Sequence, residues 1–196
     1  MKKKYNIGLL NGTICSKDGK KKASIGIKNN KIIKIGKISE KECIKFIDCK
    51  DKHILPGIID TQVHFREPGL SHKEDIYSGT NSALLGGVTT IFEMPNTSPA
   101  TISKIELEKK LKIAKNSSWV NYSFFIGACK ENLNKLSQLE KLKGCSGIKI
   151  FMGSSTGTLL LSDEKDLAKA LKTCKRRVAL HSEDETRLKK RFKLID

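Results

Sequence analysis

Three residues of types that bind metal ions stand at the ends of predicted strands: His64, Lys149 and His181. The carboxyl ends of parallel strands meet at one edge of a sheet, so we expect these three side chains to converge. Neutral imidazoles are good zinc ligands, and zinc lowers the pKa of a bound water enough to supply hydroxide near neutral pH. The three residues therefore predict a metal-dependent hydrolytic site.

Lys149 fits this set only after a chemical change. A buried amine without a partner is costly, but a lysine that reacts with CO₂ becomes a carbamate, an anionic oxygen ligand that can bridge two metal ions. Each residue also has a simpler interpretation, because a single histidine at a strand end is commonly structural and a lysine can extend its amine to solvent. The combination of the three favours the metal site.

The elements that must position these residues alternate through residues 54–196. Five apolar strands are predicted at residues 58–65, 88–94, 120–127, 147–151 and 178–181. Charged helical segments follow them near residues 73–85, 103–115, 131–142, 163–173 and 184–192. Such alternation is typical of a parallel α/β sheet. The first strand leads into polar residues rather than a glycine-rich phosphate loop, which favours a (β/α)₈ barrel of the TIM type over an open sheet.

Residues 1–53 have a different rhythm, in which short apolar runs are separated by turn residues. Asn11-Gly12 and Asn29-Asn30 are typical of tight hairpin turns, which need positive φ. We predict a small antiparallel, β-sandwich-like segment here, followed by a partial metal-dependent hydrolase barrel at 54–196. A complete barrel needs eight units and about 250 residues, so five units lead us to expect the N-terminal portion of a longer protein, or a truncated product.

The composition argues against several other classes of protein. The 196 residues carry 38 Lys+Arg and 21 Asp+Glu, a formal charge of +17, but only 6% aromatic residues and no nucleic-acid-binding motif. This pattern favours a lysine-rich solvated surface over nucleic-acid binding. No apolar run reaches the roughly 20 residues of a membrane span. The six cysteines form no CxxC pair and are interpreted as reduced thiols of a cytoplasmic protein.

Four ordered motifs resemble the dihydroorotases of the cyclic amidohydrolase superfamily. They are residues 55–69, which end in His-Phe-Arg-Glu-Pro-Gly, residues 86–97, residues 147–157, and the His-Ser-Glu run at 181–183. The resemblance covers essentially the whole chain. It implies the reversible, zinc-dependent cyclisation of N-carbamoyl-L-aspartate to dihydroorotate in pyrimidine biosynthesis.

The resemblance also implies roles for individual residues. His64 and His181 would bind one or two zinc ions, Lys149 would be the carbamylated bridging ligand, and Arg66 and Asn96 would hold the substrate carboxylate. A guanidinium suits that task because its fork grips a carboxylate at two points. A homodimer and aspartate carbamoyltransferase are the partners that the resemblance suggests.

Two departures from the family pattern matter. The family's first strand carries His-x-His, but this chain has Gln62 in place of the first histidine, and an amide oxygen is a weaker zinc ligand. The family's catalytic Asp comes from strand eight, beyond residue 196, so no catalytic acid–base residue is assigned in this chain.

Two alternatives therefore stay open. One is a non-catalytic dihydroorotase homologue that scaffolds aspartate carbamoyltransferase, to which Gln62 points. The other is a related cyclic amidohydrolase of the hydantoinase or allantoinase type, against which the carboxylate-binding pair Arg66 and Asn96 argues.

Overall fold

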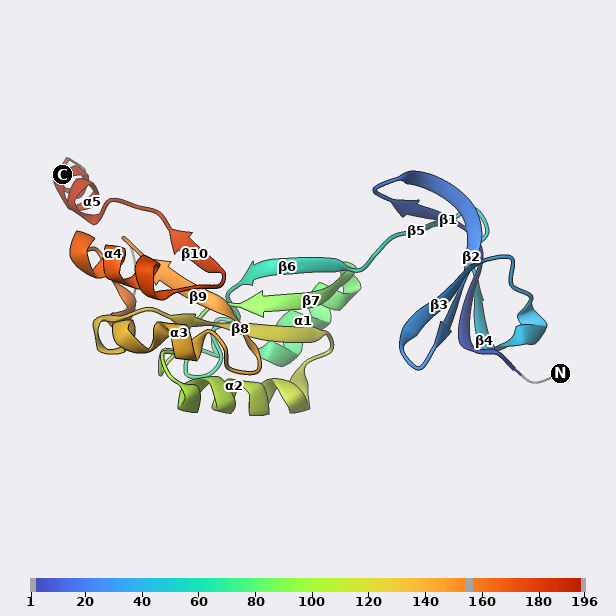
Figure 1. The fold of residues 1–196 in the computed structure, drawn as a ribbon, viewed down its shortest axis with the longest axis horizontal. Helices are drawn as coiled ribbons and strands as arrows, with labels where there is room; N and C mark the ends of the chain where they lie inside the picture. Colours follow the sequence, from blue (N-terminus) through green and yellow to red (C-terminus); the bar gives the residue numbers. More distant parts are fainter. Residues whose placement is uncertain (1–2, 154–156, 195–196) are drawn as a thin grey trace. The chain divides into compact units, whose positions relative to one another are not determined.

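The computed structural model describes residues 3–153 and 157–194 and divides the chain into two compact units, Met1–Pro56 and Gly57–Asp196. Figure 1 shows a β-sheet in the first unit and a sheet accompanied by helices in the second. Within the described residues, no helix has both the length and the apolar character needed to cross a membrane.

The first unit is a five-stranded mixed sheet. Its strands are β1 (Tyr5–Ser16), β2 (Gly19–Lys28), β3 (Lys31–Gly36), β4 (Cys43–Asp48) and β5 (His53–Ile54), and a short 3₁₀ turn, η1 (Glu40–Glu42), precedes β4. The order is β3-β2-β1-β4, and β5 also pairs with β1. The predicted turn at Asn29-Asn30 is confirmed, since it joins β2 to β3 with φ of 50° and 60°.

Two predictions for this unit are wrong. The sheet is not wholly antiparallel, because β4 and β5 both run parallel to β1. Asn11-Gly12 makes no hairpin turn but lies inside β1, where the register with β2 shifts between Leu9 and Gly12. The positive φ of 62° at Asn11 therefore serves a β-bulge, a feature with the same local backbone requirement as a turn.

The second unit contains five parallel strands in the order β10-β9-β8-β7-β6. They are β6 (Ile58–Val63), β7 (Val88–Glu93), β8 (Asn121–Gly127), β9 (Cys145–Phe151) and β10 (Val178–His181). All four pairings along this order are parallel. Sequential order with parallel pairing is the pattern of a curled, incomplete (β/α)₈ barrel, so the predicted fold class is confirmed.

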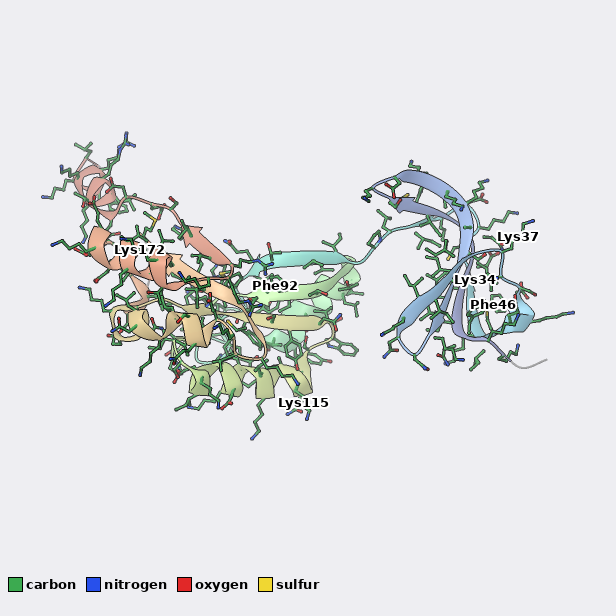
Figure 2. The ribbon with its side chains drawn as sticks, in the orientation of Figure 1. Lys34, Lys37, Phe46, Phe92, Lys115 and Lys172 are labelled. Carbon is green, nitrogen blue, oxygen red and sulfur yellow. The ribbon has the colours of Figure 1, made fainter. Side chains whose placement is uncertain are left out.

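The connections between strands contain the helices α1 (Ile76–Leu85), α2 (Lys104–Ser117), α3 (Leu136–Leu139) and α4 (Glu164–Thr173), and a short 3₁₀ segment, η3 (Gly157–Leu159). A fifth helix, α5 (Glu185–Phe192), follows β10. Figure 1 shows α1 and α2 along one side of β6, β7 and β8, and Figure 2 shows Lys115 on the outer side of α2, pointing away from the sheet.

The helix predicted at residues 131–142 begins as a 3₁₀ segment, η2 (Lys130–Lys135), and continues as the short helix α3. Here Asn132 accepts a hydrogen bond from the Cys129 backbone and donates to the carbonyls of Ile102 and Gly127, so tertiary contacts hold the tighter turn.

The strands of the second unit present different side chains to their two faces. Ile148 and Ile150 of β9 belong to the main hydrophobic core, together with Leu107 of α2 and Ala170 of α4. Lys149 lies between the two isoleucines and therefore points to the opposite, interior face, because side chains alternate along a strand. The helices thus bury one face of the sheet, and the other carries the predicted site.

Candidate active site at the strand ends

The structure brings the three predicted metal ligands into one electrostatic environment. His64 directly follows β6, Lys149 lies in β9 and His181 ends β10. Burial is the largest cause of a lowered pKa at His64, and the charges of Arg66, Lys149 and His181 lower it further. Lys149 and His181 lie on neighbouring strands, where Lys149 pairs in register with Ala179 and His181 with Phe151. That all three side chains converge on one metal site stays a prediction.

His64 is oriented by a side chain from the next strand's loop. Its Nδ1 lies 2.9 Å from Oδ1 of Asn96. An amide oxygen can only accept, so this contact assigns the proton to Nδ1 and leaves Nε2 with a free lone pair. A neutral imidazole held in one tautomer is the form that binds a metal ion.

Lys149 is buried without a counterion among the described residues. Only 1% of its surface is exposed, and its amine lies 5.0 Å from the centre of the Phe151 ring. Its strand neighbours at the same level are Gly127 and Ala179, neither of which has a polar side chain. Burial lowers the pKa of the Lys149 amine, because the low-dielectric surroundings disfavour its charge.

His181 is only half buried, and its Nε2 lies 2.7 Å from Oε2 of Glu183. Its ring also lies 5.8 Å from the ring of Phe151, the residue beside it in β9. Glu183 therefore orients His181 as Asn96 orients His64. The two imidazoles come from the two edge strands of the five-stranded sheet, β6 and β10, and each has a polar partner.

Arg66 and Asn96 form the other predicted pair. Arg66 Nη1 lies 3.5 Å from the backbone carbonyl of Asn96, so the two loops after β6 and β7 are in contact. Arg66 has a φ of 70°, a left-handed backbone that is uncommon for a residue other than glycine. The structure therefore places the arginine beside Asn96, on a loop whose backbone is held in an unusual conformation.

The loop that carries Asn96 is rigidly bonded. The carbonyl of Pro95 accepts hydrogen bonds from the backbone N–H groups of Thr97 and Thr101, both at 2.9 Å. The Thr101 carbonyl in turn accepts from the N–H of Gly127 in β8, at 2.8 Å. Asn96 is thus presented by a loop that is fixed to the sheet.

Gln62 of β6 is exposed and stands two residues before His64. Its backbone N–H donates to the Asp60 carboxylate at 3.0 Å. The position that carries the first histidine of the family pattern is therefore occupied by an exposed amide.

A buried ion pair behind the site escaped the sequence analysis. Lys110 of α2 pairs with Glu93 at the end of β7, and their side chains are 0% and 1% exposed. One signal was present: Lys110 occupies the helix position between Leu107 and Ala114, both of which face the core. A lysine on the apolar stripe of a helix indicates a buried partner.

His64, Lys149 and His181 can together bind a metal ion only if Lys149 is carbamylated. Within residues 3–153 and 157–194, no group of three His, Cys, Asp or Glu side chains is arranged to bind one. Two imidazoles and a lysine amine are available instead. The amine becomes an anionic oxygen ligand only as a carbamate, and a buried lysine without a counterion is suited to that reaction. The residues therefore fit a zinc site that includes a modified Lys149.

Comparison with known proteins decides the family. The family model described as dihydro-orotase-like matches residues 51–187. The chain belongs to the dihydroorotase-like family. The resemblance identified from the four motifs is thereby confirmed.

Individual members of the family and its neighbours agree with this assignment. A dihydroorotase from Methanosarcina mazei is 40% identical over 169 residues, which are 83% of this chain and 36% of that protein. An allantoinase from Desulfitobacterium hafniense is 37% identical over 148 residues, 75% of this chain and 33% of that protein. Among solved structures, the L-hydantoinase of Arthrobacter aurescens superimposes with a TM-score of 0.88 at 27% identity, over 97% of this chain and 44% of that one. The chain therefore spans about a third of the length of these curated relatives.

Proposed function

We propose that the protein containing this chain is a zinc-dependent dihydroorotase, which interconverts N-carbamoyl-L-aspartate and dihydroorotate. The proposal is supported by the positions of His64, Lys149 and His181 in or directly after the strands β6, β9 and β10, and by the contacts of His64 and Arg66 with Asn96. The similarity to dihydroorotases over most of the chain supports the same conclusion. We place the reaction in the cytoplasm, in keeping with the free cysteines of the described residues.

The proposed ligands are His64, His181 and a carbamylated Lys149. Carbamylation needs the unprotonated amine, whose nitrogen forms a bond to the carbon of CO₂ while one proton leaves to solvent. The lowered pKa of Lys149 increases the unprotonated fraction. Zinc, when bound, lowers the pKa of water and polarises carbonyl groups. Asn96 and Glu183 hold the two imidazoles in the orientations described above.

The substrate's free carboxylate is assigned to Arg66 and Asn96. The Oδ1 atom of Asn96 is engaged by His64, so its Nδ2 amide hydrogens remain available to donate to an anion. The guanidinium of Arg66 adds a positive charge and a planar set of donors. Together they select a cyclic amide that carries a carboxylate over one that lacks it.

The test is a paired assay of the intact protein. We expect it to close N-carbamoyl-L-aspartate, to contain zinc, and to lose activity when a chelator removes the metal. A metal-free protein that turns over neither substrate and binds aspartate carbamoyltransferase would instead identify the scaffolding homologue.

A second candidate is suggested by the allantoinase and hydantoinase similarities. A cyclic amidohydrolase of that type would act on hydantoin, allantoin or dihydrouracil, none of which carries the carboxylate of dihydroorotate. Arg66→Ala separates the two candidates: it should raise the KM for dihydroorotate and leave turnover of a neutral cyclic amide unchanged. An Arg66→Ala variant that keeps its full activity on dihydroorotate would exclude the assigned role of this residue.

A further inference from the structure

The buried pair Glu93–Lys110 lies directly behind the loops that carry Arg66 and Asn96. Glu93 is the last residue of β7 and pairs in register with Val63 of β6. The Lys110 amine contacts the Glu93 carboxylate and also donates to the Met94 carbonyl at 3.1 Å. The pair therefore ties helix α2 to the point where the chain leaves β7 towards Asn96.

The same carboxylate reaches the loop that carries Arg66. The backbone N–H and the charge of Arg66 both stabilise the ionised form of Glu93, although burial leaves the Glu93 pKa raised overall. In addition, the Met94 N–H donates to the carbonyl of Val63 at 2.9 Å. These contacts thus join Lys110 of α2 to the end of β7 and, through Val63, to the end of β6, three residues before Arg66.

The backbone of Arg66 needs such support. Its φ of 70° lies in a region that is costly for a residue with a side chain, and such conformations persist only where the surroundings impose them. The hydrogen bond from the Met94 N–H to the Val63 carbonyl and the contact of Lys110 with Glu93 fix the ends of β6 and β7 from which this loop departs. Without the Glu93–Lys110 pair, the loop after β6 is less constrained to keep the guanidinium of Arg66 next to Asn96.

Stability alone does not explain this pair. Two fully buried charges pay a desolvation cost that often equals or exceeds their attraction, and apolar residues of similar volume are frequently as stabilising. Lys110 also lies 4.9 Å from the Phe124 ring centre, in an otherwise apolar environment. A role in positioning the neighbouring loops accounts for the presence of these two charges in the protein interior.

We propose that Glu93 and Lys110 are positioning residues, which hold the Arg66 and Asn96 loops in the arrangement that binds the substrate carboxylate. This inference rests on the proposed dihydroorotase function. Neither residue is assigned a contact with the substrate, so the effect should act through Arg66 and Asn96.

The experiment is a double-mutant cycle in the intact protein, read as the dissociation constant of dihydroorotate. Glu93→Met/Lys110→Met removes both charges while keeping unbranched side chains of similar length, which avoids leaving one buried charge unpaired. We expect this change to weaken dihydroorotate binding by about 10-fold or more, as small displacements of positioned groups do. In an Arg66→Ala background the same change should have a smaller effect than in the wild-type background, because the charged member of the positioned pair is absent.

Two controls separate positioning from general damage. Binding of dihydrouracil, which lacks the carboxylate, should be unchanged by the paired substitution. Lys109→Met, on the exposed neighbour of Lys110 in α2, should leave both ligands unaffected. Glu93→Gln provides a milder second probe with the same expected pattern, should the paired variant fail to fold.

The outcomes are distinguishable. Equal losses for dihydroorotate and dihydrouracil, or equal losses with and without Arg66, would overturn the positioning role, as would unchanged dihydroorotate binding. A wild-type protein that neither binds nor turns over dihydroorotate would refute the proposed function itself.

Discussion

The second unit buries two lysines in different regions, and the contrast between them is informative. Lys110 lies on the helix-covered side of the sheet, where Glu93 neutralises it. Lys149 lies on the interior side, where no acidic side chain of the described residues pairs with it. Burial lowers the pKa of both amines, but only at Lys110 does a neighbouring carboxylate oppose that effect.

The presence or absence of a carboxylate partner indicates what a buried lysine does in the protein. A lysine that is buried together with its counterion has its cost offset by a fixed partner, so it acts in the architecture of the protein. A lysine that is buried without one is poised to become neutral and to react. The same residue type therefore points to a positioning role in one region and to chemistry in the other.

The largest effect is expected on activity at Lys149. Lys149→Met should lower the turnover of the intact protein by about 10³-fold or more, because a bound metal contributes several kcal/mol to catalysis. It should not lower the melting temperature of the metal-free protein, since it removes an unpaired buried amine. Steady-state assays and calorimetry measure these two properties, and ¹³C NMR after incubation with ¹³C-bicarbonate detects the carbamate of Lys149.

The matched control for this prediction is Lys172→Met on the exposed surface of α4, where Figure 2 labels the side chain. It should retain both the activity and the carbamate signal. A fully active Lys149→Met variant would remove the proposed metal ligand from the mechanism.

At Lys110, substitution is expected to lower the stability of the fold, unlike at Lys149. Lys110→Met leaves the Glu93 carboxylate buried without its partner, so the free energy of unfolding should fall by about 3–5 kcal/mol. Urea titration of the intact protein measures this change against Lys109→Met. The contrast between the two buried lysines fails if the Lys110 and Lys109 variants unfold at the same urea concentration.

An intermediate effect is expected at Asn96. Asn96→Ala removes the acceptor that orients His64, and loss of such a partner commonly lowers metal affinity by about 10–100-fold. Competition with a chromophoric chelator measures the zinc affinity directly and does not depend on substrate binding. Ser98→Ala, on an exposed residue of the same loop, is the control; equal zinc affinities in both variants would show that His64 needs no orienting partner.

The smallest effect concerns pH. Burial holds the pKa of His64 below its usual value of 6.5, so as pH falls the unfolded chain binds a proton before the folded chain does. The contribution of His64 to the unfolding free energy is therefore fully present above pH 6.5 and is lost as pH falls through the folded pKa. Denaturant titrations across this range, with chelator present, should show a shallower pH dependence for His64→Asn than for wild type. His72→Asn, on an exposed histidine, should keep the wild-type dependence.

Much of the second unit could be predicted because its signals are local. Apolar runs of strand length alternate with amphipathic helices, and the strand ends mark where His64, Lys149 and His181 must lie. Predictions were wrong where tertiary contacts overrode a local preference. Asn11-Gly12 has the backbone requirement of a turn, but pairing of β1 with β2 on both sides makes it a bulge. Residues 131–142 have a helical pattern, but the Asn132 contacts hold a 3₁₀ turn.

The sequence by itself determined the five strand–helix units, the family and the three residues that end or line the strands, because side-chain alternation and chain order suffice for them. Only the tertiary structure decided that Asn96 contacts His64, that Lys110 is buried with a counterion, and that Lys149 is buried with none among the described residues. These features depend on contacts between residues 17 to 32 positions apart, or on what is absent around a buried amine, and neither leaves a periodic trace along the chain.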